Sequence, residues 1–342
     1  MDAPRTLFVA ADGGAVGALE PLAPLFDCTL DDVRSDEAAD IGYWLQRIDA
    51  TVAELVVVGT SDSTRGRTIE AAARRAAHAR GLPLAAIEDF PGNYYEVPEG
   101  QPDLVLAESP PARERLLARL GAQALRMEIA SPARYDVYRA RLQELRAATR
   151  QEWTLASKRH AAPVVLWAGQ PETDDALTTL DALLPTISSL GARLHFKAHP
   201  RDDGYAAGRY RNILSAPHVE DVTYLSPSDV LAAAPALVAT QFSSLAIEAG
   251  FYGIPALFIL LPEAGGATLL KKKGYAAPPL CEVGAGALAC TDAALAGALA
   301  TMLCDEVHRA RVLRCFDTYF EVATVSAPEV CERLVRLVRE RK

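Results

Sequence analysis

The chain contains no hydrophobic run long enough to cross a membrane. None of its stretches approaches the ~18 consecutive apolar residues that a spanning helix requires. Its first residues lack the basic flank, apolar core and cleavage site of a signal peptide. A net charge of −9 at pH 7 argues against a nucleic-acid backbone as partner, because binding to phosphates needs clustered positive charge. We therefore expect a soluble, cytoplasmic protein with no transmembrane segment and no nucleic-acid partner.

Cysteine is scarce, and the motifs of metal and dinucleotide sites are missing. The 6 cysteines form no Cys-x-x-Cys pair and have no histidine at a zinc-like spacing, which predicts neither a metal site nor a disulfide framework. No Asp-x-Asp metal motif occurs. Gly13, Gly14 and Gly17 do not form Gly-x-Gly-x-x-Gly, so a dinucleotide fingerprint is excluded. We expect no cofactor and no bound metal.

Half of the 342 residues are hydrophobic, and they are arranged in short apolar runs that alternate with helical stretches. This rhythm is typical of βαβ units and predicts an α/β fold with parallel sheets. At ~150 residues per domain, the length favours two domains. We place the first at residues 1–150 and the second at 151–342, with a charged connection at 137–160 and a last helix, Pro328–Arg341, that can cross back to the first domain. The predicted strands are Thr6–Ala10, Glu54–Val58, Leu84–Ile87, Leu104–Leu106, Val164–Trp167, Arg193–Lys197, Ala236–Thr240 and Ala256–Leu260.

The most informative segment runs from a predicted strand through Ser243 and Ser244 into a predicted helix that stops at Gly253. The start of such a helix offers free N–H groups, two hydroxyls and a positive helix end to an anion. Glu248 lies one turn beyond Ser244 on the same face, where a carboxylate can accept hydrogen bonds from ribose hydroxyls. An ordinary capped helix is the alternative, because serine is a common N-cap.

This Ser-Ser…Glu-Ala…Gly-x-Pro segment resembles the nucleotide-sugar-binding element of the GT-B fold, which glycosyltransferases share with UDP-N-acetylglucosamine 2-epimerases. The resemblance covers nearly the whole chain at the level of architecture and a few short motifs at the level of residues. It implies two Rossmann-like α/β domains facing across a cleft. The first domain would then lie on the acceptor side, and the second would bind the nucleotide sugar.

A second motif, His199-Pro200, closes the predicted strand that ends in Lys197 and is followed by Arg201. A histidine at a strand end can donate to a phosphate, and the two cations add local positive charge. The motif resembles the His-Pro element of bacterial sialyltransferases and capsule Kdo transferases, where it binds the CMP portion of the donor. Lys-x-His-Pro also occurs in teichoic-acid polymerases that use CDP-linked donors. A structural histidine before a proline turn is the alternative.

Gly169-Gln170 follows the first predicted strand of the second half. Glycine permits a close approach of the backbone to a ligand, and glutamine can hydrogen-bond a donor or product. The pair resembles the Gly-Gln loop at the same place in capsule Kdo transferases. A plain strand-to-helix turn is an equally good interpretation of the same residues.

Glu88 and Asp89 follow a buried strand of the first half, where an acid can deprotonate an acceptor hydroxyl. They are similar to the paired-acid motif of bacterial sialyltransferases, in which one acid is the general base, although two residues here separate the acids from the glycine of that motif. Asp89 is the first choice for the base and Glu88 the second. A turn with solvated acids is the alternative.

Asp12-Gly13-Gly14 resembles the glycine-rich loop near the acceptor side of GT-B enzymes. Arg65, in a hydroxyl-rich segment, can hold an anionic acceptor, although capping of the following helix is the favoured interpretation of that segment.

Together these features predict a glycosyltransferase that moves a sugar from a nucleotide-activated donor to a hydroxyl acceptor with inversion. A CMP-sugar is favoured and a UDP-sugar is possible. Asp89 is the expected base, while His199, Ser243 and Ser244 stabilise the departing phosphate. The alternatives are a nucleotide-sugar 2-epimerase, whose first-half motifs match poorly, and a catalytically silent nucleotide-sugar-binding protein. The sequence leaves homo-oligomerisation open.

Overall fold

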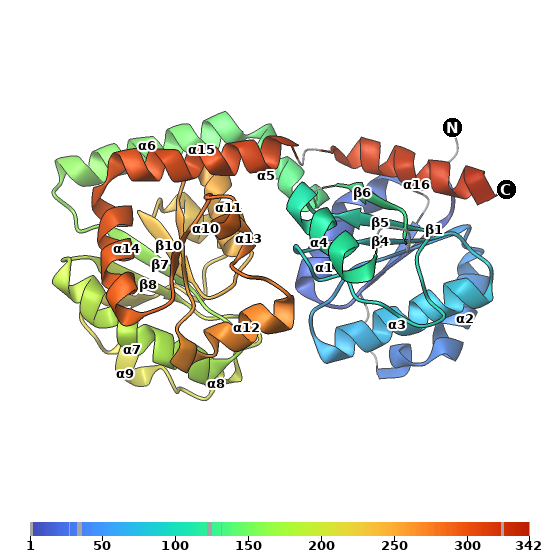
Figure 1. The fold of residues 1–342 in the computed structure, drawn as a ribbon, viewed down its shortest axis with the longest axis horizontal. Coiled ribbons are helices and arrows are strands. Elements are labelled where there is room, and N and C mark those ends of the chain that lie inside the picture. Colours follow the sequence, from blue (N-terminus) through green and yellow to red (C-terminus); the bar gives the residue numbers. More distant parts are fainter. Residues whose placement is uncertain are drawn as a thin grey trace. The chain divides into compact units, whose positions relative to one another are not determined.

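The computed structural model describes residues 3–26, 28–32, 36–121, 125–130, 132–322 and 325–341. The chain forms two compact units (Figure 1). The first comprises Met1–Val137 with Phe320–Lys342, and the second comprises Tyr138–Tyr319. Residue 150, where we placed the boundary, lies inside helix α6 (Leu142–Lys158) of the second unit.

In the described part of the first unit, six parallel strands pair in the order β2-β1-β3-β4-β5-β6. Their bounds are β1 Thr6–Ala10, β2 Cys28–Asp32, β3 Leu55–Val58, β4 Leu84–Ile87, β5 Leu104–Ala107 and β6 Met127–Ile129. The side chains of β1, β3, β4 and β5 are buried throughout, which explains their continuous apolar runs. The register places Phe8 opposite Val57.

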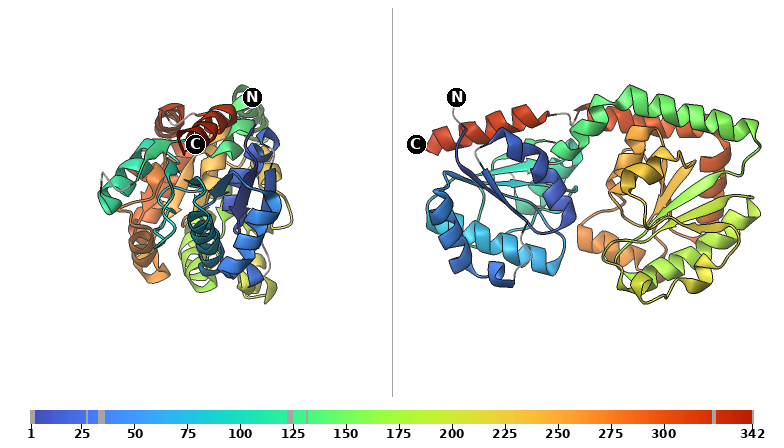
Figure 2. Two further views of the ribbon diagram at one scale, coloured as in Figure 1. Left: turned by 90° about the vertical axis from the view of Figure 1, so that its right-hand side faces the viewer. Right: turned by 180° about the vertical axis from the view of Figure 1, so that it is seen from behind.

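Helices cover both faces of this sheet. The helical segments are α1 Gly13–Leu19, η1 Glu20–Leu25, η2 Asp36–Ala39, α2 Ile41–Thr51, α3 Thr64–Ala79, α4 Pro110–Leu120, η3 Ala133–Tyr135 and α16 Ala327–Arg341. Helix α5, Asp136–Ala140, begins in the first unit and continues from Tyr138 in the second. One face packs against α2, α3 and α4. The other packs against α1, η1 and α16, whose Leu334 and Leu337 are buried in that core. Figure 2 shows α16, in red, lying along the unit that contains the N-terminus.

The second unit repeats this architecture. Its described strands pair in parallel in the order β12-β11-β10-β7-β8-β9. Their bounds are β7 Val164–Ala168, β8 Arg193–Lys197, β9 Val219–Asp221, β10 Leu237–Thr240, β11 Ala256–Ile259 and β12 Ala287–Ala289. The prediction of an α/β fold with parallel sheets is therefore confirmed.

Two apolar cores enclose the second sheet as well. The helical segments are α6, α7 Thr173–Ser189, α8 Asp203–Ala206, α9 Arg211–Leu214, α10 Pro227–Ala232, α11 Leu245–Tyr252, η4 Pro262–Ala264, α12 Gly266–Lys273, α13 Pro279–Glu282, α14 Asp292–Cys304 and α15 Glu306–Val322. Helices α7, α9 and α14 pack on one face, and α6, α10 and α11 pack on the other. Helices α6 and α15 lie side by side (Figures 1 and 2), joined by an ion pair between Arg146 and Asp317. Among the described residues, no helix combines the length and apolar character that crossing a membrane requires.

Candidate functional site

Three neighbouring strands of the second unit, β10, β7 and β8, end at the same edge of their sheet. Gly169 and Gln170 follow β7, His199 follows β8, and Ser243 and Ser244 follow β10. Ligands of parallel α/β sheets bind beyond the carboxyl ends of the strands. The predicted nucleotide-binding residues therefore lie on adjacent loops at the edge where such ligands bind.

The loop after β7 packs against the loop after β8 through Gly169. Its N–H donates a hydrogen bond of 2.9 Å to Lys197 O. A Cβ at this position would lie 2.9 Å from His199 N and 3.0 Å from Lys197 O. Both of these atoms are backbone and cannot rotate away, so the close packing requires glycine.

His199 is half-buried, and its ring orientation is set by the next turn. Its Nδ1 accepts a hydrogen bond of 3.1 Å from Arg201 N. A neutral imidazole that accepts at Nδ1 carries its proton on Nε2, which can then donate to an anionic oxygen. Pro200 and Arg201 are exposed beside it.

Lys197 and Gln170 use their polar ends on the protein itself. The Lys197 ammonium donates to the carbonyls of Thr223 and Leu225, and burial lowers the pKa of this lysine. The Gln170 Nε2 donates to Gly169 O at 2.9 Å and to Thr240 Oγ1 at 3.2 Å. Both side chains hold loops at the carboxyl edge of the sheet, and their contact with a nucleotide-sugar donor stays a prediction.

The segment after β10 opens helix α11. Ser243 Oγ accepts from Leu245 N at 3.2 Å, and Ser244 occupies the cap position of the helix without a side-chain cap hydrogen bond. The helix ends at Gly253, whose φ of 78° is left-handed, as expected for a glycine stop. The two serines are half-buried. They therefore stand where the positive end of the helix can act on an anion.

Glu248, one turn into α11, is oriented by a residue that the sequence did not reveal. Its Oε2 accepts a hydrogen bond of 2.8 Å from the hydroxyl of Tyr138. The Tyr138 ring stacks on Phe251, with centroids 5.6 Å apart and planes within 10°. No local signal marks Tyr138, because its partners lie in a helix far along the chain.

In the first unit, Asp89 lies at the end of β4 with its side chain almost fully buried. Its Oδ1 accepts hydrogen bonds from Thr60 Oγ1 at 2.8 Å and from Asn93 Nδ2 at 3.1 Å. A Cβ on Gly14 would lie 2.4 Å from Asp89 Oδ2, so this glycine makes room for the carboxylate. The predicted residues Asp89 and Gly14 thus come together, and Thr60 and Asn93 join them.

Arg134 connects the loops around Asp89. Its guanidinium donates to Gly14 O at 2.9 Å and to Asp89 O at 2.8 Å. It comes from η3, after the edge strand β6, and was not among the predicted site residues. An arginine with fixed planar donors holds such backbone groups in one geometry.

Glu88, the second choice for the base, is fully buried. Its Oε1 accepts from Tyr94 N at 3.2 Å and its Oε2 from Glu108 N at 3.3 Å. Burial, helped by the charges of Glu108 and Asp89 and opposed by those hydrogen bonds, raises the pKa of Glu88 to about 8. This carboxyl holds the loop after β4, which leaves Asp89 as the better candidate for chemistry.

The remaining predicted acceptor-side residues have separate surroundings. Asp12 Oδ2 accepts from the backbone N–H of Asp62 at 2.9 Å and of Ser63 at 2.8 Å, so its carboxylate holds the loop after β3. Gly13 is exposed. Arg65 is also exposed and lies 3.2 Å from Asp36, and a surface pair of this kind contributes little stability.

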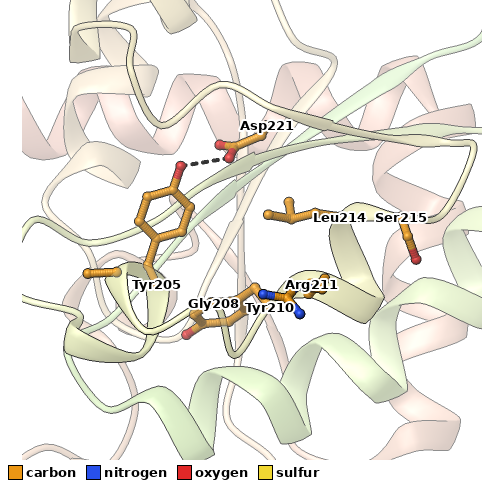
Figure 3. A pocket seen from close by; sticks show the side chains of 8 residues that line it. Tyr205, Gly208, Tyr210, Arg211, Leu214, Ser215 and Asp221 are labelled. Carbon is orange, nitrogen blue, oxygen red and sulfur yellow. Dashed lines mark hydrogen bonds between the residues drawn. The ribbon is translucent and has the colours of Figure 1, made fainter.

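A cavity of about 590 Å³ lies elsewhere in the second unit, between α8, α9 and the end of β9 (Figure 3). Tyr205 donates a hydrogen bond of 2.7 Å to Asp221 Oδ2 on its wall. The cavity is lined by none of the predicted site residues. In the described part of the chain, no group of three or more His, Cys, Asp or Glu side chains is placed to hold a metal ion.

Comparison with solved structures identifies the fold. The chain is 15% identical to the Methanocaldococcus jannaschii UDP-GlcNAc 2-epimerase in complex with UDP-GlcNAc and UDP, with a TM-score of 0.62 over 98% of this chain and 99% of that one. The chain is 14% identical to S. aureus MnaA with UDP, with a TM-score of 0.60 over 98% of this chain and 96% of that one. It is 14% identical to CalG4, the calicheamicin glycosyltransferase, with a TM-score of 0.52 over 99% of each chain. No protein-family model and no curated protein matches the sequence. At these identities the likeness shows the fold alone, a GT-B-type arrangement of two Rossmann-like domains.

Proposed function

We propose that this protein is a glycosyltransferase that uses a nucleotide-activated sugar. The observation that carries the proposal is the meeting of three loops at the ends of β7, β8 and β10, with Gly169 packed on the backbone of His199 and two serines opening α11. His199 Nε2–H and the positive end of α11 would stabilise the negative charge that develops on the departing phosphate. Glu248, held by Tyr138, would accept hydrogen bonds from the ribose hydroxyls.

Asp89 is the proposed general base. Its Oδ1 accepts from two neutral donors, Thr60 and Asn93, and an ionised carboxylate can accept both bonds. In the proposed inverting step, the acceptor oxygen bonds to the anomeric carbon while the bond from that carbon to the phosphate oxygen breaks. The acceptor proton passes to Asp89, and the negative charge leaves with the nucleotide.

A CMP-sugar is our favoured donor, since the His199-Pro200 motif resembles the CMP-binding element of sialyltransferases and Kdo transferases. A UDP-sugar is the second choice, because the M. jannaschii structural neighbour is described with UDP-GlcNAc and UDP.

The second candidate function is nucleotide-sugar 2-epimerisation. Likeness in fold to UDP-GlcNAc 2-epimerases over nearly the full length of both chains favours it. Such a reaction needs no acceptor, and the product is the nucleotide sugar or free sugar with C2 inverted. Product analysis therefore separates the two functions.

The test is incubation of the protein with CMP- and UDP-sugars, with and without a hydroxyl acceptor, followed by NMR analysis of the products. Acceptor-dependent release of nucleotide with a new glycosidic bond supports the proposal. A 2-epimer formed without acceptor contradicts it in favour of the second candidate. Asp89→Asn should abolish transfer while nucleotide binding persists, and full transfer by this variant would refute the assignment of the base.

A further inference from the structure

Glu70 is a fully buried carboxyl group on α3, behind the loop that follows β3. Its Oε1 accepts a hydrogen bond of 2.6 Å from Ser61 Oγ, and its Oε2 accepts one of 2.9 Å from Ser61 N. The hydroxyl of Tyr95 lies 3.1 Å from the same Oε2. These partners are neutral groups of the protein, and a buried charge among neutral partners is costly.

The protons available to this cluster indicate that Glu70 carries one of them. The Tyr95 hydroxyl lies 3.0 Å from Arg67 O and 3.1 Å from Glu70 Oε2, and its single proton can go to only one acceptor. If it goes to the Arg67 carbonyl, a proton on Glu70 Oε2 completes the second hydrogen bond by donating to the Tyr95 oxygen. With Glu70 protonated, both contacts of the Tyr95 hydroxyl contain a proton. With Glu70 ionised, the Tyr95 oxygen faces either Arg67 O or Glu70 Oε2 without a proton between them.

Charged groups of both signs surround the cluster of Glu70, Ser61 and Tyr95. Asp89 is the negative group that raises the pKa of Glu70, after burial as the main cause, and together they bring it to about 8. The guanidinium groups of Arg67 and Arg74 lie over the Tyr95 ring, 5.2 Å and 5.4 Å from its centroid. Arg67 is itself bound to Asp62 at 3.1 Å.

The cluster is connected to the candidate base through the loop after β3. Ser61, fixed by two hydrogen bonds to Glu70, also accepts one of 3.0 Å from Asp12 N through its Oγ. The neighbouring residue Thr60 donates to Asp89 Oδ1 at 2.8 Å. Glu70 therefore fixes the peptide segment from which Thr60 reaches Asp89.

We propose that Glu70, as a neutral carboxylic acid, is a positioning residue that holds the Thr60–Ser61 segment and through Thr60 the carboxylate of Asp89. This role rests on the proposed function, in which Asp89 is the base. When Glu70 loses its proton, a second negative charge appears close to Asp89, and the Tyr95 hydroxyl keeps a proton for only one of its two contacts, with Glu70 Oε2 or with Arg67 O. Transfer should therefore decline on the alkaline side as Glu70 ionises.

The first test is infrared difference spectroscopy on wild type, Glu70→Gln and, as a matched control, Glu114→Gln, whose side chain is exposed on α4. At neutral pH, the difference spectrum of wild type minus Glu70→Gln should contain the carbonyl stretch of a protonated carboxylic acid. This band should disappear as the pH rises, with a midpoint near pH 8. The Glu114→Gln difference should lack that band. A Glu70→Gln difference without the band at neutral pH overturns the proposal, whatever the activity.

The second test is the pH profile of transfer. Glu70→Gln should keep kcat within ~3-fold and lose the alkaline decline, while Glu70→Ala should lower kcat by ~10-fold or more with KM for the donor little changed. Equal losses in both variants, or an unchanged alkaline decline in Glu70→Gln, contradict the positioning role.

A wild type without transfer activity would refute the proposed function but not the state of Glu70, which the infrared band decides. Positioning is then read from the ¹³C chemical shift of the Asp89 carboxyl. Glu70→Ala should move it, and Glu114→Gln should not. An unmoved Asp89 signal in Glu70→Ala overturns the positioning role.

Discussion

Tyr138 and Glu248 lie 110 residues apart in the sequence and share a hydrogen bond of 2.8 Å in the second unit. The Tyr138 ring is held by stacking on Phe251, so the position of its hydroxyl is fixed by packing. Helix α11 presents Glu248, and the tyrosine determines the orientation of its carboxylate. The first prediction follows from this pair.

Tyr138→Phe should weaken nucleotide binding by about tenfold or more, because a hydrogen bond to a charged group contributes ~1.5–3 kcal/mol and every 1.4 kcal/mol is a factor of ten. The phenylalanine keeps the ring stacked on Phe251, so the fold should persist. Calorimetric titration gives the Kd. Tyr224→Phe, at a tyrosine of the same unit with 79% of its surface exposed, is the control and should bind as wild type does. Equal Kd values for the two variants would show that Tyr138 does not serve the nucleotide.

Gly169→Ala should destabilise the protein and reduce nucleotide binding. The added Cβ meets two backbone atoms at the end of β8, Lys197 O and His199 N, which must shift, and overpacking of this kind costs ~1–3 kcal/mol. Chemical denaturation measures the loss. The control is Gly297→Ala in helix α14, where a Cβ meets nothing within 4 Å. That variant should gain up to ~1 kcal/mol from helix propensity, and a similar loss in both would refute the packing argument.

Glu88→Gln should flatten the dependence of stability on pH. The pKa of Glu88 in the folded chain is about 8, above the ordinary value of 4.5, so the folded state keeps a proton that the unfolded state releases between these values. Wild-type stability should therefore fall as pH rises from 4.5 towards 8. Urea denaturation at several pH values should show a smaller slope for Glu88→Gln and a wild-type slope for Glu114→Gln. Parallel curves for Glu88→Gln and wild type would contradict the buried, protonated carboxyl.

Thr60→Val removes the hydroxyl that bonds Asp89 Oδ1 and keeps the size of the side chain. If Asp89 is the base, kcat for transfer should fall by ~10-fold, because a misplaced base loses much of its contribution. Nucleotide affinity should not change, since Thr60 lies in the first unit. Thr68→Val, at an exposed position of α3, is the matched control. An unchanged kcat in Thr60→Val would separate Thr60 from the chemistry.

The eight strands predicted from the sequence all occur. Among the described residues there are four further strands, β2, β6, β9 and β12, and these are the edge strands of the two sheets. Central strands of a parallel sheet are buried on both faces and appear as apolar runs, as in Leu55–Val58. The edge strands are short, as in Ala287–Ala289, or mixed in composition, as in Cys28–Asp32, so no long apolar run marks them.

The candidate site was predictable only where a motif is local. The Ser243-Ser244 start of α11 is visible in one stretch of sequence. The contacts of Asp89 with Thr60 and Arg134 depend on which strands are neighbours, which a single chain does not disclose. The surroundings of Lys197 were not predictable either, since its ammonium bonds two backbone carbonyls that lie 26 residues or more along the chain. Its contact with a ligand stays a prediction.

The most direct test of the central claim is nucleotide binding to the loops after β7, β8 and β10. Thermal stability is measured with CMP, CDP, UDP, GDP and dTDP, for wild type and for His199→Ala. A ligand at 100 times its Kd stabilises the folded state by ~2.7 kcal/mol, which a melting curve resolves. We predict a clear shift with CMP in the wild type that His199→Ala greatly reduces. A folded wild type that shifts with none of the five nucleotides would contradict the account.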